Sequence, residues 1–212
     1  MADARKLVAA ALLRVEADGG YSNIVLNSAL NSSEISHADR ALASALFYGV
    51  LDRRITIDWL LSKHIKTPLK KVAPYTLTVL RCAVYQIAFM EKIPESAAVN
   101  EAVKLIKASG ERRNAAFVNA VLRNIIRTGT DLPYGNDVRT LSVRYSCPEW
   151  IVKSFINDYG EENAVELLSQ SLKTPPVTVR VNTVRTTPER LIKILEENNV
   201  KPPAPKRKMR LQ

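Results

Sequence analysis

The sequence has few of the residues from which catalytic and cofactor sites are most often built. It contains two histidines and two cysteines, and Cys82 and Cys147 lie far apart. Such a small set leaves no cluster with metal-ligand spacing and no disulfide framework. Of the seven glycines only Gly19 and Gly20 are adjacent, and they follow a predicted helix rather than a strand. We therefore expect no glycine-rich loop for a nucleotide, an adenosyl cofactor or a phosphate.

The individual candidates for chemistry have simpler structural explanations. His37 lies in a capping segment and His64 near a helix end, so both are predicted to be surface or capping residues. Cys82 lies beside an apolar helix face and is predicted to be a small core residue. Cys147 precedes Pro148 at a helix start, but no base or second cysteine is nearby in the sequence, which favours a structural role. The carboxylates are scattered, so we predict no catalytic, cofactor-binding or metal site in this chain.

Long apolar runs are also missing. No uncharged stretch approaches the roughly 20 residues that a membrane-spanning helix needs, and the N-terminus leads into an amphipathic segment rather than a signal peptide. These observations predict a cytoplasmic protein without a membrane partner.

Positive charge is abundant and unevenly distributed. The chain has 31 Lys and Arg against 21 Asp and Glu, a net charge of +10. Residues 1–130 carry a balance of +7, residues 131–200 a balance of −2, and residues 201–212 five basic residues and no acidic one. A basic domain attracts polyanions, and RNA is the abundant polyanion of cytoplasm. The alternative is that the charge only keeps the protein soluble.

Helical spacing of apolar residues dominates the first 130 residues, where we predict about seven helical segments and no strand. Proline and capping residues set most starts. The predicted segments are 3–17 capped by Asp3, 21–30 capped by Ser22, a stretch opened by Ser36 that bends at 52–54 and continues to about 65, a central helix opened by Pro74, one from Pro94 to Gly110, and one from Arg112 to Arg127. Such a pattern is typical of an all-α bundle.

The remaining residues predict a smaller unit that is incomplete. Residues 131–140 read as a linker, followed by helices at 148–159 and 161–172. Alternation over Val177–Asn182 predicts one strand, and Thr187-Pro188 begins a further helix ending near Asn198. A lone strand leaves its backbone groups unpaired, so the predicted α+β unit of residues 141–200 needs partners from elsewhere. The basic, proline-rich tail 201–212 is predicted to be disordered.

Several short motifs, in order, resemble one known family. The chain is similar to the N-terminal portion of the Sun/RsmB family of bacterial 16S ribosomal RNA cytosine-5 methyltransferases. The residues that carry the resemblance are Ala4-Arg5, Gly19–Asn23, Asp39–Leu42, Tyr48–Asp52, Leu80-Arg81, Tyr85-Gln86, Ile93-Pro94, Ala97–Val103, Phe117–Asn124, Tyr145–Trp150, Tyr159–Glu162 and Arg180–Thr183. Cys147 stands where that family usually has histidine or an aromatic residue.

The resemblance implies a NusB-like RNA-binding helical domain over residues 1–130, a linker at 131–140, and the start of the family's pre-catalytic domain at 141–200. In that family an S-adenosylmethionine-binding domain with two catalytic cysteines follows, and nothing in this sequence corresponds to it. The chain is therefore expected to contribute recognition of 16S rRNA but to be inactive alone. A frameshift, a premature stop or a gene-calling artefact would account for such an ending.

The resemblance also suggests where RNA is bound, because the first basic helix of NusB-type proteins meets RNA. The matching basic residues here are Arg5 and Lys6, with Arg14 further along the same predicted helix. Arg112 and Arg113 open the last predicted helix, where unpaired backbone N–H groups also favour phosphate. Arg53 and Arg54 form a third basic pair and complete the predicted RNA-binding residues. Tyr21 and Tyr48 offer stacking surfaces for bases, although packing is the favoured interpretation, and Asn100, Asn119 and Asn124 are interpreted as bundle hydrogen-bonders. Two other functions stay open: an antitermination-like RNA-binding module with protein partners, and a pure protein-interaction bundle. No DNA partner is expected.

Overall fold

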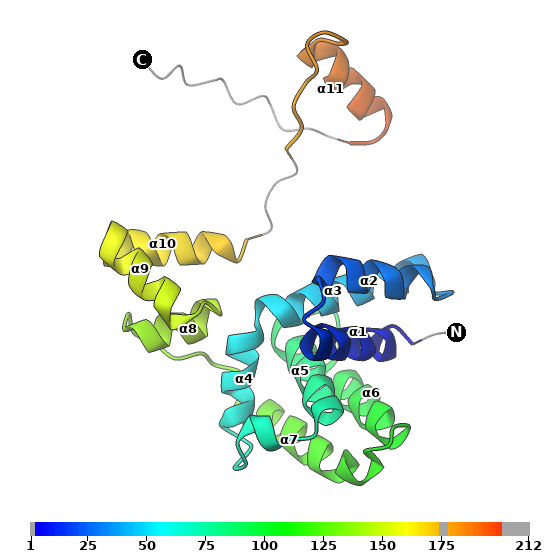
Figure 1. The fold of residues 1–212 in the computed structure, drawn as a ribbon, viewed down its shortest axis with the longest axis vertical. Helices are drawn as coiled ribbons and strands as arrows, with labels where there is room; N and C mark the ends of the chain where they lie inside the picture. Colours follow the sequence, from blue (N-terminus) through cyan, green and yellow to red (C-terminus); the bar gives the residue numbers. More distant parts are fainter. Residues whose placement is uncertain (1–2, 174–177, 201–212) are drawn as a thin grey trace. The chain divides into compact units, whose positions relative to one another are not determined.

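The computed structural model describes residues 3–173 and 178–200, and the chain divides into two compact units, residues 1–173 and residues 174–212. The described part of the first unit consists of helices joined by short connections (Figure 1). Its α-helices are α1 (Ala4–Asp18), α2 (Ser22–Asn31), α3 (His37–Asp52), α4 (Arg54–Ser62), α5 (Pro74–Phe89), α6 (Glu95–Lys107), α7 (Ala115–Thr128), α8 (Val138–Tyr145), α9 (Glu149–Tyr159) and α10 (Glu161–Ser171). Two 3-10 turns, η1 (Leu69–Lys71) and η2 (Arg112–Asn114), precede α5 and α7.

Capping residues explain most of these helix boundaries. The Asp3 carboxylate accepts the Arg5 N–H at 2.9 Å, and the Ser36 hydroxyl oxygen accepts the Asp39 N–H at 3.1 Å, so both predicted caps are confirmed. The predicted cap of α2 is wrong: Ser22 is already helical, and Tyr21 precedes the helix without a side-chain capping bond. Helix α1 ends at Gly19, whose φ of +62° lies in the left-handed region that favours glycine.

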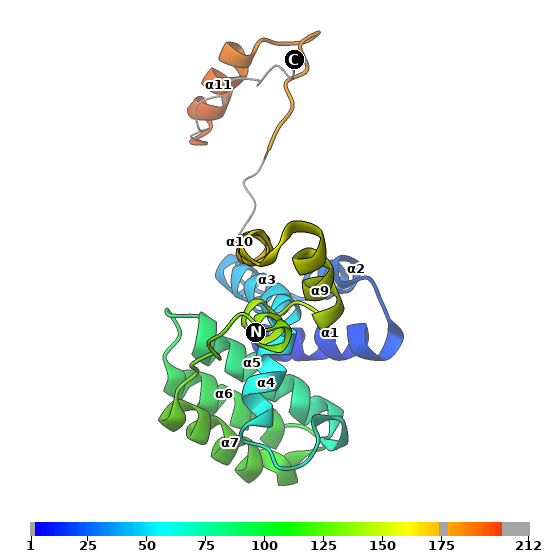
Figure 2. The same cartoon turned by 90° about the vertical axis from the view of Figure 1, so that its left-hand side faces the viewer.

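Helix α5 lies at the centre of the bundle, as its sequence predicts (Figures 1 and 2). It packs against α1, α3, α4, α6 and α7, and it is buried over most of its circumference. At Gly49 the backbone of α3 lies directly against the Tyr85 ring of α5, so a Cβ atom added there would overlap that ring. The expectation of an all-α bundle in the first 130 residues is thus confirmed.

A buried ion network ties three of these helices together. Arg81 of α5 is only 5% exposed, and its guanidinium donates to both carboxylate oxygens of Asp58 in α4, at 2.7 and 2.8 Å. It also donates to Glu16 of α1 at 2.6 Å. Burial alone would lower the pKa of Arg81, but the hydrogen bond and charge of Asp58 and the charge of Glu16 outweigh it, so the pKa is raised. The cation therefore stays charged inside the bundle.

Helix α8 begins inside the segment predicted as a linker, which corrects the sequence interpretation. It packs on α4, where the Thr56 hydroxyl donates to the Val143 carbonyl at 2.6 Å and the Ser146 hydroxyl oxygen accepts the Ile55 N–H at 3.1 Å. Ser146 ends α8 in the left-handed region, with φ of +51°. Glycine is the usual residue there, but it has no hydroxyl to close the first turn of α4.

Helices α8, α9 and α10 enclose a small second core. Leu141, Val152 and Leu168 are fully buried in it, one from each helix. The predicted helices at 148–159 and 161–172 correspond to α9 and α10, and their starts are fixed by Pro148 and Gly160. This core has few members, because much of the apolar surface of α9 and α10 is left at the outside.

The described part of the second unit, residues 178–200, contains one helix, α11 (Pro188–Glu197), whose first turn is capped by the Thr187 hydroxyl at 3.3 Å from the Arg190 nitrogen. The strand predicted at Val177–Asn182 is not formed in residues 178–182, and Val177 lies outside the described residues. A β-strand needs backbone hydrogen bonds to a neighbouring strand, and an alternating sequence alone does not provide that neighbour. The tail 201–212 lies outside the described residues. None of the described helices has the length and apolar character to cross a membrane.

Candidate nucleic-acid interface

The seven basic residues predicted to bind RNA lie in three separate regions of the first unit. Arg5, Lys6 and Arg14 belong to α1, Arg53 and Arg54 stand at the junction of α3 and α4, and Arg112 and Arg113 lie in η2. Their surroundings differ, so their capacity to meet a phosphate differs as well.

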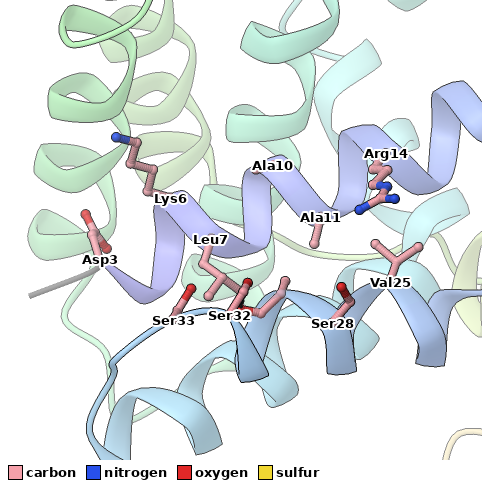
Figure 3. Close-up of a pocket in the computed structure, with 11 residues that line it drawn as sticks. Asp3, Lys6, Leu7, Ala10, Ala11, Arg14, Val25, Ser28, Ser32 and Ser33 are labelled. Carbon is pink, nitrogen blue, oxygen red and sulfur yellow. Dashed lines mark hydrogen bonds between the residues drawn. The ribbon is translucent and has the colours of Figure 1, made fainter.

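The first region is a groove between α1 and α2, shown in Figure 3. One stripe of α1, including Val8 and Leu12, is buried against the bundle, which leaves Lys6 and Arg14 exposed on other sides of the helix. Ser28 and Ser32 come from the α2 side, and in Figure 3 their hydroxyls point toward α1. The groove is lined by Asp3, Lys6, Leu7, Ala10, Ala11, Arg14, Val25, Ser28, Ala29, Ser32 and Ser33.

This groove contains both charged and uncharged hydrogen-bond donors, and phosphate oxygens accept hydrogen bonds from either kind. Lys6 and Arg14 are eight residues apart, or about 12 Å along the helix axis, so they can meet successive parts of an extended backbone. The serine hydroxyls between them add uncharged donors. The carboxylate of Asp3 lies at the end of the groove, where it caps the Arg5 N–H. The charge of the groove is thus positive with a modest excess.

The Arg5 side chain is bound to α5 and is not free to contact RNA with its Nε. Its Nε donates to the Gln86 side-chain oxygen at 2.7 Å, and the Gln86 amide donates in turn to the Cys82 carbonyl at 2.9 Å. Gln86 is buried in α5. The guanidinium of Arg5 therefore satisfies a polar group of the bundle core and fixes α1 on α5.

The Arg53-Arg54 pair is held by the fold as well. The Arg53 guanidinium stacks over the Phe89 ring at 4.9 Å, and burial lowers its pKa. Arg54 forms an ion pair with Glu16 at 3.0 Å while 47% of its side chain stays exposed. Both arginines connect the α3–α4 junction to its neighbours, which sequence alone does not show.

Arg112 and Arg113 are exposed but do not occupy the predicted place. Helix α7 begins at Ala115, three residues later than expected, and the arginines lie in the preceding 3-10 turn. They therefore do not form a helix N-terminal anion site. Arg112 instead lines a groove that also contains Lys104 and Lys107 of α6, two basic residues that the sequence interpretation did not single out. Their three-residue spacing in the last turn of α6 was the available signal.

The two tyrosines differ in exposure. Tyr21 is 79% exposed, which overturns the packing interpretation for this residue. Tyr48 is 39% exposed, and its ring meets Phe47 edge-on with centroids 5.4 Å apart. Tyr21 stands one helical turn before Val25, which lines the groove between α1 and α2.

The cysteines and His64, which are the candidates for chemical reactivity in the sequence, are partly or fully buried among other side chains. Cys82 is a core residue, as predicted, and burial raises its pKa to about 12. Burial also raises the pKa of the half-buried Cys147 thiol. His64 is hydrogen-bonded to the Asn124 amide at 2.9 Å, and burial followed by the charge of Lys63 lowers its pKa. Among residues 3–173 and 178–200 no group of three or more potential metal ligands comes together.

Comparison with known proteins adds two domain assignments. Residues 2–127 match the NusB family, and residues 147–206 match the ferredoxin-like domain of RsmF/B-like methyltransferases. A probable ribosomal RNA small subunit methyltransferase B of Bacillus subtilis is 38% identical over 85% of the chain and 41% of its own length. Its counterpart in Synechocystis is 28% identical over 94% of the chain and 45% of its own length. The chain spans less than half the length of these two relatives.

Two other kinds of relative match as well. The transcription antitermination protein NusB of Shewanella baltica is 29% identical over 58% of the chain and 92% of its own length. A solved structure titled as a plectonemic RNA supercoil contains a chain with a TM-score of 0.56 and 20% identity, covering 59% of this chain and 93% of that one. The structure of PH0851 gives a TM-score of 0.66 at 17% identity, covering 98% and 47%. These two structural likenesses support the fold.

Proposed function

Because the chain belongs to the NusB family through residues 2–127 and continues into a ferredoxin-like domain of the RsmF/B type, we propose that it is the RNA-recognition region of a small-subunit rRNA cytosine-5 methyltransferase. Residues 1–130 bind RNA, and residues 141–200 begin the domain that leads to the methyltransferase part. Methyl transfer from S-adenosylmethionine belongs, in this proposal, to the length of the relatives that this chain does not share. The protein acts in the cytoplasm, where ribosomal RNA is made in bacteria.

The groove between α1 and α2 carries this proposal. The groove is lined by Lys6, Arg14, Ser28, Ser32 and Ser33. The Lys6 side chain extends from the rim of the groove, away from α2, so cationic donors border the neutral ones. Contacts of this kind give affinity and strong salt dependence but little choice of sequence. Arg5, Arg53 and Arg54 act on the bundle itself, and Arg112 and Arg113 remain candidates for RNA contact.

A salt titration tests the proposal. The full chain is titrated into a fluorescein-labelled single-stranded RNA taken from 16S rRNA, and anisotropy is measured at several salt concentrations. We expect the affinity to fall steeply with salt. The Lys6→Gln/Arg14→Gln variant should reduce the slope of log K against log salt by about 1.4, since each lost single-strand phosphate contact lowers it by about 0.7.

A matched variant controls for loss of charge. Arg139→Gln/Lys153→Gln removes two exposed cations that lie outside the groove and should leave the slope almost unchanged. Absent or salt-independent binding by the unaltered chain would overturn the RNA-binding function. Equal slopes for the two variants would remove the groove from it.

A second function is favoured by the NusB relatives, whose length this chain covers almost completely. In that reading the bundle acts in transcription antitermination together with protein partners. A read-through assay on a terminator template separates the two, because only the antitermination function changes read-through when the chain is added. The match of residues 147–206 to the ferredoxin-like domain favours the rRNA methyltransferase function.

A further inference from the structure

A second groove of the first unit lies between α6 and α7 and is bordered by η2. Lys104 and Lys107 line it from α6, Arg112 lines it from η2, and the amides of Asn100 and Asn119 lie in the same groove. All three cations are exposed. In both views α6 and α7 lie at the end of the bundle away from α2, so this groove is distinct from the one between α1 and α2 (Figures 1 and 2).

The charge of this groove is poorly compensated. Glu111 is adjacent to Arg112 in sequence, but its carboxylate accepts the Thr76 N–H at 2.8 Å and the Thr76 hydroxyl, and so it is engaged at the start of α5. Glu101 approaches Lys104 at 3.5 Å, and 69% of the Lys104 side chain stays exposed. Such a surface pair contributes little. Residues 95–128 hold six Lys and Arg against three Asp and Glu.

A simpler role explains only part of this arrangement. Lys104 and Lys107 lie in the last turn of α6, where cations favour the partial negative charge of the helix end. That role needs neither Arg112, which comes from a separate turn, nor the two amides. Asn119 accepts from Arg123 Nε at 3.0 Å through its oxygen, which leaves its amide nitrogen as the donor end.

We propose that this groove binds the sugar–phosphate backbone of single-stranded RNA at a second place on the bundle. The three cations meet phosphates, and the asparagine amides meet phosphate oxygens or ribose hydroxyls. This inference rests on the proposed RNA-binding function and adds to it a second contact surface. One RNA strand then engages both ends of the helical bundle.

The test compares two triple variants of the full chain. Lys104→Gln/Lys107→Gln/Arg112→Gln removes the cations of the groove, and Arg139→Gln/Lys153→Gln/Lys173→Gln removes three exposed cations elsewhere in the first unit. Anisotropy with a labelled single-stranded RNA of mixed sequence gives the affinity at each salt concentration. Circular dichroism and thermal melting check that both variants remain folded.

We expect the groove variant to lower the slope of log K against log salt by about 2, since each lost single-strand phosphate contact lowers it by about 0.7, and to weaken binding roughly tenfold at low salt. The control variant should keep the slope of the unaltered chain. If the unaltered chain binds RNA and both triple variants share its slope, the second contact is refuted while the proposed function stands. If the unaltered chain does not bind RNA, both fail.

Discussion

Replacing Arg81 by methionine should destabilise the bundle strongly, because the substitution removes the cation that joins α1, α4 and α5. Methionine keeps the length and the apolar stem of the side chain, so the change mainly removes charge and hydrogen bonds. Three charge-assisted hydrogen bonds of 2.6, 2.7 and 2.8 Å are lost. Asp58 and Glu16 then lose the cation that they share, although Glu16 keeps its ion pair with Arg54 at 3.0 Å.

The size of the effect follows from the exposure of the three partners. Hydrogen bonds to charged groups contribute about 1.5–3 kcal/mol each, but such values do not add. Breaking a buried ion pair costs about 3–5 kcal/mol when the remaining charge stays buried. Here the side chains of Asp58 and Glu16 are 29% and 27% exposed, so water can approach them after the loss. We therefore expect a cost of about 3 kcal/mol, a large part of the 5–15 kcal/mol that is typical of a folded domain.

Urea denaturation followed by circular dichroism measures this cost, and a double-mutant cycle assigns it. Asp58→Asn combined with Arg81→Met should cost less than the sum of the single changes by roughly 1–2 kcal/mol, because the two residues interact directly. Arg123→Met, on the exposed side of α7, is the matched control and should change the stability by less than about 0.5 kcal/mol. A cost below about 1 kcal/mol for Arg81→Met, or a cycle without coupling, would refute the reasoning.

Three further expectations concern packing and chemistry. Gly49→Ala should lower the free energy of unfolding by about 1–3 kcal/mol because its Cβ would overlap the Tyr85 ring. In thermal melts, Gly49→Ala/Tyr85→Leu should recover part of that loss. An unchanged melting temperature for the single variant would contradict the close approach of the two helices. At pH 8 a thiol reagent should modify Cys147 before Cys82, because the buried Cys82 thiol has a pKa of about 12 and forms its reactive thiolate only at higher pH. Mass spectrometry of folded and urea-unfolded protein should show that Cys82 reacts only after unfolding. Incubation with radiolabelled S-adenosylmethionine and 16S rRNA should give no methyl transfer by this chain alone, whereas measurable turnover would show that its described cysteines or neighbouring groups can act.

The bundle could be predicted from sequence where local chemistry decides the outcome. Asp3, Ser36 and Pro74 fix helix starts through hydrogen bonds or a restricted φ within a few residues of themselves. The apolar character of α5 on most sides indicated its central position. The sequence does not predict α8 because its buried face consists of only Leu141, Ser142 and Val143. That face is stabilised by packing on α4, and the contacting residues Thr56 and Val143 are 87 positions apart in the sequence.

The candidate site was less accessible to sequence reasoning because a basic residue looks the same whether it is paired or open. The sequence predicts Arg54 as a phosphate ligand, but in the structure Glu16 of α1 forms an ion pair with it. Arg5 likewise meets Gln86, 81 residues further along the chain. The spacing of Lys104 and Lys107 indicates a basic helix end, but only the fold shows that Arg112 lines the same groove. Long-range pairing, and not local pattern, separates structural cations from available ones.

The hydrogen bond between the Ser146 hydroxyl and the Ile55 N–H restricts motion between the bundle of α1–α7 and the helices that follow it. Because the Ser146 hydroxyl oxygen accepts the Ile55 N–H and the Val143 carbonyl accepts the Thr56 hydroxyl, the end of α8 is anchored to α4 at a point only three residues before α9 starts. Any swivel between the bundle and α9 is then confined to the short step from Ser146 to Pro148. A piece that ends near residue 130 would lose this anchor, so a separately expressed bundle should keep α8 together with α9 and α10, whose shared core contains Leu141.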